Sequence, residues 1–214
     1  MTTFPQHAGH RVQRAHTGDV EVLAHVIAEA FFDLAVSQWL VPDPHARRAI
    51  LPGYFGIYVE QALSDGLVVT TPARDAAALW QPVAADGPVP PAQDYHHRLA
   101  ALTGPHLARF QALDQAFNQH HPAGVTHEHL MILAVRPDRQ RLGIGTALLN
   151  ARHAVLDRDW IPAYLEASDL ATRDIYLTCG YADYGTPIQL PDGPSMYPMW
   201  RHPHRNAETA HWGV

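Results

Sequence analysis

The chain has 214 residues, the size of one domain or of two small ones. Apolar residues make up 47% of the sequence, which is enough to build a buried core and excludes general disorder. Its 15 basic and 21 acidic side chains give a net charge of −6, and this argues against a nucleic-acid-binding surface.

The residue types exclude several chemistries. All 15 basic residues are arginine, so no lysine can form a Schiff base, bind phosphate in a P-loop or act as a general base. The single cysteine, Cys179, cannot form an intrachain disulfide, which indicates a reducing compartment. The longest apolar run, 130–135, is much shorter than the roughly 20 residues of a membrane helix, and the first residues lack a secretion-signal pattern. We therefore expect a cytoplasmic protein without a membrane or nucleic-acid partner.

The first quarter of the chain reads as a short strand and two helices. Residues 11–15 alternate as a strand does, and Thr17 is a candidate N-cap for a helix that ends near Phe32. A second helical pattern covers 45–64. It contains Pro52 followed by glycine, so we expect a kink or a restart there.

A hairpin and two helices follow. Residues 66–71 and 76–80 are rich in strand-forming residues and are separated by a short turn. The prolines from Pro82 to Pro91 predict a loop without regular structure. Two apolar helical stripes then cover 95–117, broken by Gly104 and the proline after it.

The second half alternates strands and helices. A strand over 128–135 is stopped by Arg136-Pro137, and a turn containing Gly143 and Gly145 leads into a helix over 144–155. The remaining expected elements are a strand at 163–167, a helix at 170–179 and a closing hairpin formed by 181–187 and 196–201. Because no composition shift marks a boundary, we expect a single domain over 1–214, with a folded core over about 11–202 and flexible ends at 1–10 and 203–214.

The turn Gln140-Arg-Leu-Gly143-Ile-Gly145 carries the clearest chemical signal. Its glycines let backbone N–H groups converge, and the next helix begins there, so free N–H groups and the helix dipole favour a bound anion. A P-loop is excluded because the chain has no lysine, and the third glycine of a Rossmann turn is replaced by Leu148. The segment resembles instead the pattern Q/R-x-x-G-x-G/A, which is the pyrophosphate loop of acyl-CoA-dependent N-acyltransferases.

Several segments resemble the GNAT superfamily of acetyl-CoA-dependent N-acetyltransferases, in particular its branch around puromycin N-acetyltransferase. The segment 129–149 is similar to that branch's acetyl-CoA segment, and 165–168 with 176–181 is similar to its second motif. Residues 191–199 resemble its closing hairpin. The resemblance implies an α/β (α+β) GNAT fold: a mixed, mostly antiparallel central sheet, splayed between the fourth and fifth strands, with helices on both faces.

The resemblance also implies where acetyl-CoA, the cosubstrate, binds. Splayed strands leave backbone groups free for the pantetheine amide and the thioester oxygen, and the glycine turn with the first helical turn takes the pyrophosphate. Relatives usually have glycine where this chain has Arg141, and often asparagine where it has Thr172. The implied cofactor-binding residues are Leu133, Ala134, Val135, Gln140, Arg141, Leu142, Gly143, Ile144, Gly145 and Thr146.

Three side chains are candidates for proton transfer. Tyr176 is a candidate general acid, because a thiolate leaving group needs a proton; the alternative is that it packs in the core. His129 and Glu128 are candidate general bases for the attacking ammonium. Strand alternation places these two on opposite faces, so at most one of them serves, and we favour His129. Glu166 is open to a structural interpretation as a packed or capping carboxylate.

The sequence thus predicts transfer of acetyl from acetyl-CoA to a primary amine of a small molecule, such as an antibiotic or a secondary metabolite. The negative net charge favours a cationic acceptor. The sequence is also compatible with a homodimer. Alternatives are acetylation of a protein or peptide N-terminus, and a non-catalytic acyl-CoA-binding regulator. Our main prediction includes no metal-binding residue. A histidine-ligated metal enzyme is a further alternative. Aromatic candidates for the acceptor pocket are Phe31, Phe32, Trp39, Tyr54 and Trp80; histidines that suggest the metal enzyme are His120, His121, His127 and His129.

Overall fold

The structure is a computed structural model in which residues 10–87, 91 and 94–204 are described. Of the ends predicted to be flexible, His10, Pro203 and His204 are described, and the rest lies outside the described residues. Within the described part of the chain, every helix is too short or too polar to cross a bilayer.

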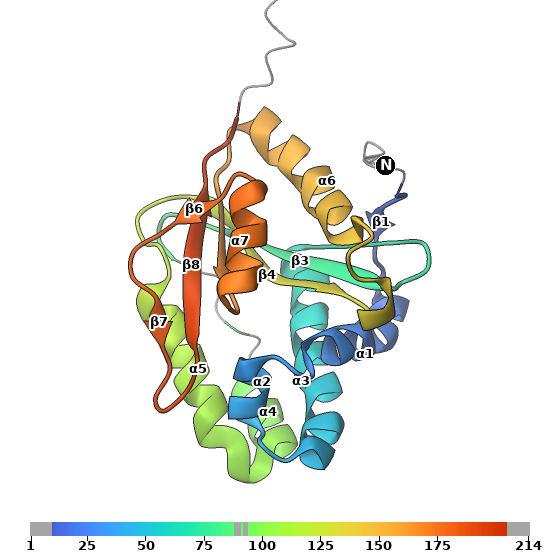
Figure 1. The fold of residues 1–214 in the computed structure, drawn as a ribbon, viewed down its shortest axis with the longest axis vertical. Coiled ribbons are helices and arrows are strands. Elements are labelled where there is room, and N and C mark those ends of the chain that lie inside the picture. Colours follow the sequence, from blue (N-terminus) through green and yellow to red (C-terminus); the bar gives the residue numbers. More distant parts are fainter. Residues whose placement is uncertain (1–9, 88–90, 92–93, 205–214) are drawn as a thin grey trace, which may run out of the picture.

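Over the described residues the strands form one eight-stranded sheet in the order β1-β2-β3-β4-β5-β8-β6, with β7 paired to β8 (Figure 1). The pairs are antiparallel except for β4 and β5, which run parallel. This topology confirms the predicted fold class. The strands are β1 (Gln13–Arg14), β2 (Leu67–Thr70), β3 (Ala76–Val83), β4 (His127–Val135), β5 (Ala163–Ala167), β6 (Ala182–Asp183), β7 (Ile188–Gln189) and β8 (Ser195–Arg201).

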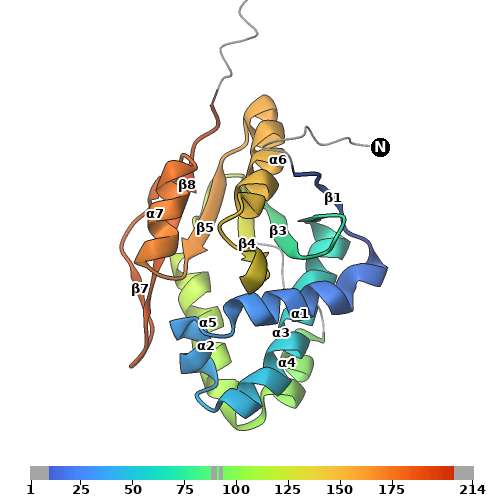
Figure 2. The same ribbon diagram turned by 45° about the vertical axis from the view of Figure 1, so that its right-hand side comes forward.

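Helices cover both faces of this sheet. On one face α1 and α3 contact β2, β3 and β4, and on the other α6 packs on β3 and β4 while α7 packs on β5 and β8 (Figures 1 and 2). The α-helices are α1 (Val20–Phe31), α2 (Ala35–Leu40), α3 (Pro44–Asp65), α4 (Tyr95–Thr103), α5 (Leu107–His120), α6 (Ile144–Asp159) and α7 (Leu170–Thr178).

The central strands separate two apolar cores. Successive side chains of a strand point to opposite faces. Val68 and Leu79 accordingly belong to the core under α1 and α3, whereas Val69 and Trp80 belong to the core under α6. Because both faces are covered, all four residues of β2 are buried, and the first three are apolar instead of alternating with polar residues.

The first helix begins later than predicted. Residues Thr17–Asp19 form a 3₁₀ turn, and α1 starts at Val20 and ends at Phe31, close to the predicted end. Asp19, rather than Thr17, organises this start, because its carboxylate accepts the backbone N–H of His16 at 2.9 Å and Nε–H of Arg74 at 3.0 Å.

The long helix α3 runs through Pro52 without interruption, so the restart predicted there does not occur. The helix begins where the Asp43 carboxylate accepts the N–H of Ala46 at 2.7 Å. The glycine after Pro52 serves packing: a Cβ on Gly53 would lie 2.7 Å from Cδ2 of Leu102 on α4. The pair therefore allows a close approach of helices instead of marking a break.

The predicted loop begins too early in the sequence. Pro82 lies within β3, opposite Glu128 of β4. Proline lacks an N–H and is tolerated where one side of a strand is unpaired. The β2–β3 ladder ends at the pair Leu67–Trp80, so β3 is bordered by β4 alone at Pro82, and this explains how the strand accommodates it. Residues 88–90 and 92–93 of the predicted loop lie outside the described residues.

Candidate active site

The parallel strands β4 and β5 part after a short ladder. Their register joins Glu128 to Ala163 and His129 to Tyr164. Beyond that point β4 stays paired with β3 as far as Val135, and β5 stays paired with β8, so the two strands diverge (Figure 2). This confirms the predicted splay and leaves one backbone edge of residues 130–135 without a strand partner within the described chain.

A β-bulge re-aims β4 at the start of this divergence. Leu79 lies opposite Ile132, but the next residue, Trp80, lies opposite Leu130, so Met131 is an extra residue on β4. Bulges bend a strand and increase its local twist. Here the bulge directs β4 away from β5 and places Met131 in the wall of the cavity described below.

The glycine turn leads directly into α6 beside this divergence. Gly143 has φ 80°, a left-handed conformation that glycine adopts without strain, and it is the N-cap of α6. Arg141 has φ 61°, so the position where relatives usually carry glycine is left-handed here as well. The first N–H groups of α6 therefore border a concave turn, as anion binding at a helix N-terminus requires.

Side-chain contacts hold the turn against the sheet. Nε2 of Gln140 donates to the carbonyl oxygen of Val135 at 3.1 Å, and Nε of Arg139 donates to Asp75 at 3.2 Å. Leu142 has an exposed side chain, and its carbonyl oxygen accepts a hydrogen bond from Nε2 of His10 at 2.7 Å. Leu142 is therefore the one predicted cofactor-binding residue that does not line the pocket described below.

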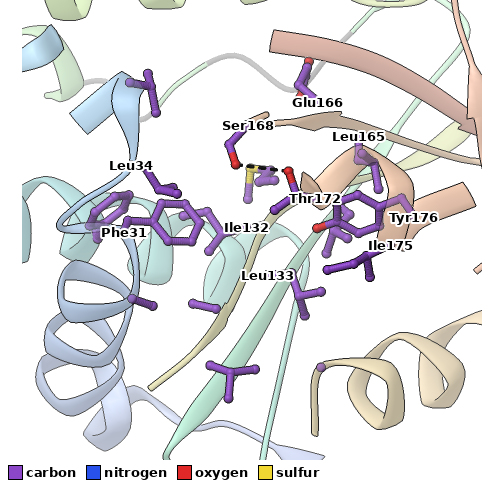
Figure 3. A pocket seen from close by; sticks show the side chains of 18 of the residues that line it. Phe31, Leu34, Ile132, Leu133, Leu165, Glu166, Ser168, Thr172, Ile175 and Tyr176 are labelled. Atoms are coloured by element: carbon purple, nitrogen blue, oxygen red, sulfur yellow. Dashed lines mark hydrogen bonds between the residues drawn. The ribbon is translucent and has the colours of Figure 1, made fainter. Parts of the chain in front are cut away.

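The divergence opens into a pocket of about 510 Å³. Figure 3 shows Phe31 and Leu34 on one side and Ile175 and Tyr176 on the other, with Ile132 and Leu133 between them. The predicted cofactor-binding residues that line it are Leu133, Ala134, Val135, Gln140, Arg141, Gly143, Ile144, Gly145 and Thr146.

Tyr176, on α7, lines the pocket with its hydroxyl directed into it (Figure 3). Burial, with a smaller contribution from Cys179, raises the pKa of its phenol, so the side chain keeps its proton at neutral pH. Thr172, one turn earlier, also lines the pocket, and its N–H donates at 2.7 Å to the carboxylate of Asp169, the N-cap of α7.

The sequence matches no known family model. The fold is similar to that of solved acetyltransferases. A protein from Corynebacterium glutamicum described as histone acetyltransferase HPA2 and related acetyltransferase is 24% identical, with a TM-score of 0.67 over 92% of this chain and 97% of that one. Arylalkylamine N-acetyltransferase 2 from Aedes aegypti is 11% identical, with a TM-score of 0.59 over 91% and 99% of the two chains. The PaiA N-acetyltransferase from Thermoplasma acidophilum, solved with coenzyme A, is 11% identical, with a TM-score of 0.54 over 90% and 98%. The chain has the GNAT fold.

Within this GNAT fold, the candidate bases of β4 occupy opposite faces of the sheet, as strand alternation predicts. Glu128 is buried on the α6 side and forms an ion pair with Arg152, with Nε of the arginine 3.3 Å from Oε2. His129 lies on the other face, where its Nε2 is 2.8 Å from Oε2 of Glu166. The structure thus separates Glu128 from the pocket and joins His129 to a carboxylate that lines it.

Glu166 is the functional candidate that sequence reasoning left as a packed carboxylate. Its side chain is 5% exposed, and Oε1 has no hydrogen-bond partner among the described residues. Burial acts to raise the pKa of this carboxyl, but the charge and hydrogen bond of His129, together with His121, outweigh it and hold the pKa below its usual range. The sequence offers no direct signal for this contact, because it depends on the parallel register of β4 and β5, which aligns His129 with Tyr164, two residues before Glu166.

Three aromatic rings surround this pair. The rings of His121 and Tyr164 lie with their centroids 4.9 Å and 5.3 Å from that of His129, and Nε2 of His121 is 3.1 Å from Nε2 of His127. Burial and the neighbouring His129 lower the pKa of His121 to about 4, so its ring is neutral at neutral pH. Burial also lowers the pKa of His127, although its bond to the Val125 carbonyl opposes this.

The side of the pocket that lies across from Tyr176 is aromatic (Figure 3). Phe31 and Tyr54 line it as predicted, together with Phe55, Tyr58 and Phe117. The other aromatic candidates pack elsewhere: Phe32 against Arg47, Trp39 on the Pro191 carbonyl, and Trp80 in the core beside His153.

A chain of hydroxyl groups leads away from this end of the pocket. The Tyr54 and Tyr58 oxygens are 3.1 Å apart, those of Tyr58 and Tyr95 are 3.5 Å apart, and Tyr95 donates to Asp114 at 2.8 Å. This end of the pocket thus combines apolar walls with hydroxyl groups of α3 that continue to α4 and α5.

Proposed function

We propose that this chain is a single-domain, acetyl-CoA-dependent N-acetyltransferase that transfers acetyl directly to a primary amine. The observation that carries the proposal is the convergence of four features on one pocket: the β4–β5 divergence, the glycine turn at the start of α6, Tyr176 and Glu166. The fold neighbours support it, because they are N-acetyltransferases by name and one was solved with coenzyme A.

In the proposed complex the pyrophosphate of acetyl-CoA lies over residues 140–146. The left-handed turn at Gly143 and the free N–H groups of α6 suit an anion there, and the exposed Arg141 adds a positive charge. Gly145 leaves room for the ligand beside β4, because it carries no side chain. A Cβ at this position would lie in van der Waals contact with Val135, 3.5 Å from Cγ2. The pantetheine arm follows residues 133–135 in the gap beside β4.

In the reaction, the amine nitrogen attacks the thioester carbonyl carbon. The new C–N bond forms, the C–S bond breaks and the sulfur leaves as a thiolate, to which Tyr176 donates its phenolic proton. A backbone N–H on the open edge of β4 stabilises the oxyanion that develops on the carbonyl oxygen. In this step the protein thus orients the two reactants, stabilises the oxyanion and supplies one proton to the thiolate.

We assign the removal of the ammonium proton to the pair His129 and Glu166. Glu166 lines the pocket with one carboxylate oxygen unpartnered, which suits it to accept a hydrogen bond from an entering ammonium. His129 lies behind it, and its Nε2–H donates to Oε2 at 2.8 Å, so it stabilises and orients the carboxylate that takes the proton on Oε1. Glu128 has no part in this assignment, because Arg152 holds it on the opposite face of the sheet.

The acceptor we propose is a small cationic amine with an apolar or aromatic body. A buried carboxylate at one end and Phe31, Phe55 and Phe117 along the walls match such a molecule in charge and polarity. The Aedes neighbour supports this class, since it is an arylalkylamine N-acetyltransferase by name. An antibiotic or secondary-metabolite amine fits the same description. Cytoplasmic location and homodimerisation stay predictions from sequence.

The test is release of coenzyme A thiol from acetyl-CoA across a panel of amines. The panel contains arylalkylamines, polyamines, amine antibiotics and a peptide with a free N-terminus. Turnover with a small aromatic or cationic amine supports the proposal. Turnover with the peptide alone would favour the N-terminal acetyltransferase. Silence with every amine, despite coenzyme A binding, would favour a non-catalytic regulator.

A further inference from the structure

The end of α5 meets β4 and β5 at a cluster of possible metal ligands. Among the described residues, His121, His129 and Glu166 each offer one ligand atom, and these atoms all lie within 4.8 Å of one another. His121 follows the last residue of α5, whereas the other two come from adjacent strands. Three separate elements therefore deliver two imidazoles and a carboxylate to one point.

The cluster has an unused coordination capacity. Glu166 is nearly fully buried, and its Oε1 has no hydrogen-bond partner among the described residues. The hydroxyl of Tyr164, two residues earlier on β5, also has no hydrogen-bond partner among the described residues. A buried carboxylate oxygen without a partner is unfavourable, and a bound cation would satisfy it.

The surrounding residues orient the ligands. The contact at 3.1 Å between Nε2 of His121 and Nε2 of His127 fixes the His121 ring, and His127 is itself held by the Val125 carbonyl, 2.9 Å from its Nδ1. Outer hydrogen bonds of this kind hold metal-binding histidines in place in other proteins. His127 thus supports the cluster from outside it.

We propose that His121, His129 and Glu166 bind a divalent transition-metal cation of the Zn²⁺ type. A set of two imidazole nitrogens and one carboxylate oxygen suits Zn²⁺, and three protein ligands leave a fourth coordination position for water. The metal displaces the proton that Nε2 of His129 shares with the Glu166 carboxylate, and the second carboxylate oxygen, Oε1, gains a cationic partner. Metal–nitrogen and metal–oxygen bonds form, and this proton is released to solvent.

The bound metal would be an inhibitor rather than a cofactor, an effect that rests on the proposed function. The cation occupies the pair that removes the ammonium proton, so acetyl transfer falls as the site fills. It leaves the glycine turn and the start of α6 untouched. Inhibition should therefore be relieved by EDTA and be competitive with the amine but not with acetyl-CoA.

The direct test is titration of metal-free protein, purified without a His tag, with Co²⁺ and then Zn²⁺. We expect one tightly bound equivalent, a visible Co²⁺ spectrum typical of tetrahedral coordination, and release of a proton that buffers of different ionisation enthalpy detect by calorimetry. His121→Asn should weaken binding at least tenfold, about 1.4 kcal/mol, while leaving coenzyme A binding unchanged. His120→Asn is the matched control, because that ring bonds the Ala116 carbonyl outside the cluster.

Two results would overturn the site: no metal binding at micromolar concentrations, or binding that His121→Asn leaves unchanged, which would place the ion on other histidines. Since binding is read without acetyl-CoA, these results are distinct from failure of the proposed enzyme activity. Loss of activity with EDTA would contradict the inhibitory role, because it would make the metal a requirement.

Discussion

Oε2 of Glu166 lies 2.8 Å from Nε2 of His129, and this contact joins the two strands at the point where they diverge. The carboxylate belongs to the pocket wall and the imidazole lies behind it. In the proposed complex the amine therefore meets a buried carboxylate that is hydrogen-bonded to an imidazole. The first two predictions test this arrangement.

Replacing Glu166 by glutamine should lower kcat/KM for the amine by about 10²-fold, because a neutral amide neither attracts the ammonium nor takes part in proton removal. Coenzyme A affinity should stay unchanged, since the proposed phosphate contacts come from the glycine turn and not from this side chain. Steady-state kinetics of thiol release measures the first quantity and calorimetry the second. Wild-type kcat/KM in the variant would remove Glu166 from the mechanism.

Replacing Glu128 by glutamine should give the opposite pattern. The change leaves the half-buried Arg152 without its buried carboxylate partner and should destabilise the protein by roughly 3 kcal/mol. Activity per folded molecule and its pH profile should persist, because the carboxylate faces α6. Denaturant unfolding and an assay at a temperature where the variant is folded separate the two effects. A changed pH profile would restore Glu128 as the base.

Replacing Tyr176 by phenylalanine removes the hydroxyl directed into the pocket and keeps the ring against Tyr181. We expect kcat to fall by about 10²-fold with little change in stability. The loss should shrink with acyl donors whose thiol leaving group is more acidic, because such a thiolate needs no proton. An equal loss for every donor would indicate a packing role instead.

Arg141 holds a left-handed backbone conformation, at φ 61°. Arg141→Gly should therefore stabilise the protein by about 1 kcal/mol relative to Arg141→Ala, since alanine keeps the strain. Both variants lose the guanidinium, so both should bind coenzyme A more weakly if it contacts phosphate. Paired unfolding curves decide the first point. Equal stabilities would show that the turn tolerates a Cβ without strain.

His153 makes stability depend on pH. Burial, assisted by the charge of Arg201, lowers its pKa to about 3, whereas an unfolded histidine titrates near 6.5. Between these values the unfolded state binds more protons, so the free energy of unfolding falls as pH falls, by up to about 1.4 kcal/mol per unit. His153→Gln lacks this proton and can still bond the Tyr181 hydroxyl, 3.0 Å from the wild-type Nε2. The stability of the variant should therefore decline less below pH 6.5; parallel declines would contradict the assignment.

The sequence predicts much of the site because its signals are local. The turn at Gly143 and the helix after it follow from glycine and periodicity. The opposite faces of Glu128 and His129 follow from strand alternation.

The signals that fail are those that depend on packing between distant segments. Pro52 lies inside the continuous helix α3, whose next residue, Gly53, packs closely against Leu102 of α4. Pro82 lies in β3 because the pairing of β3 with β2 ends two residues earlier, at Trp80. Glu166 gains its role from a register between two strands, which no single segment records.

Calorimetric titration with coenzyme A tests most directly whether the diverging strands and the glycine turn bind this ligand. The account predicts a single site with a dissociation constant in the micromolar range, as is typical of enzyme cosubstrates, and weaker binding when Gly145→Val fills the space beside Leu133 and Val135. Absence of binding at millimolar coenzyme A, or equal affinity in the valine variant, would contradict it.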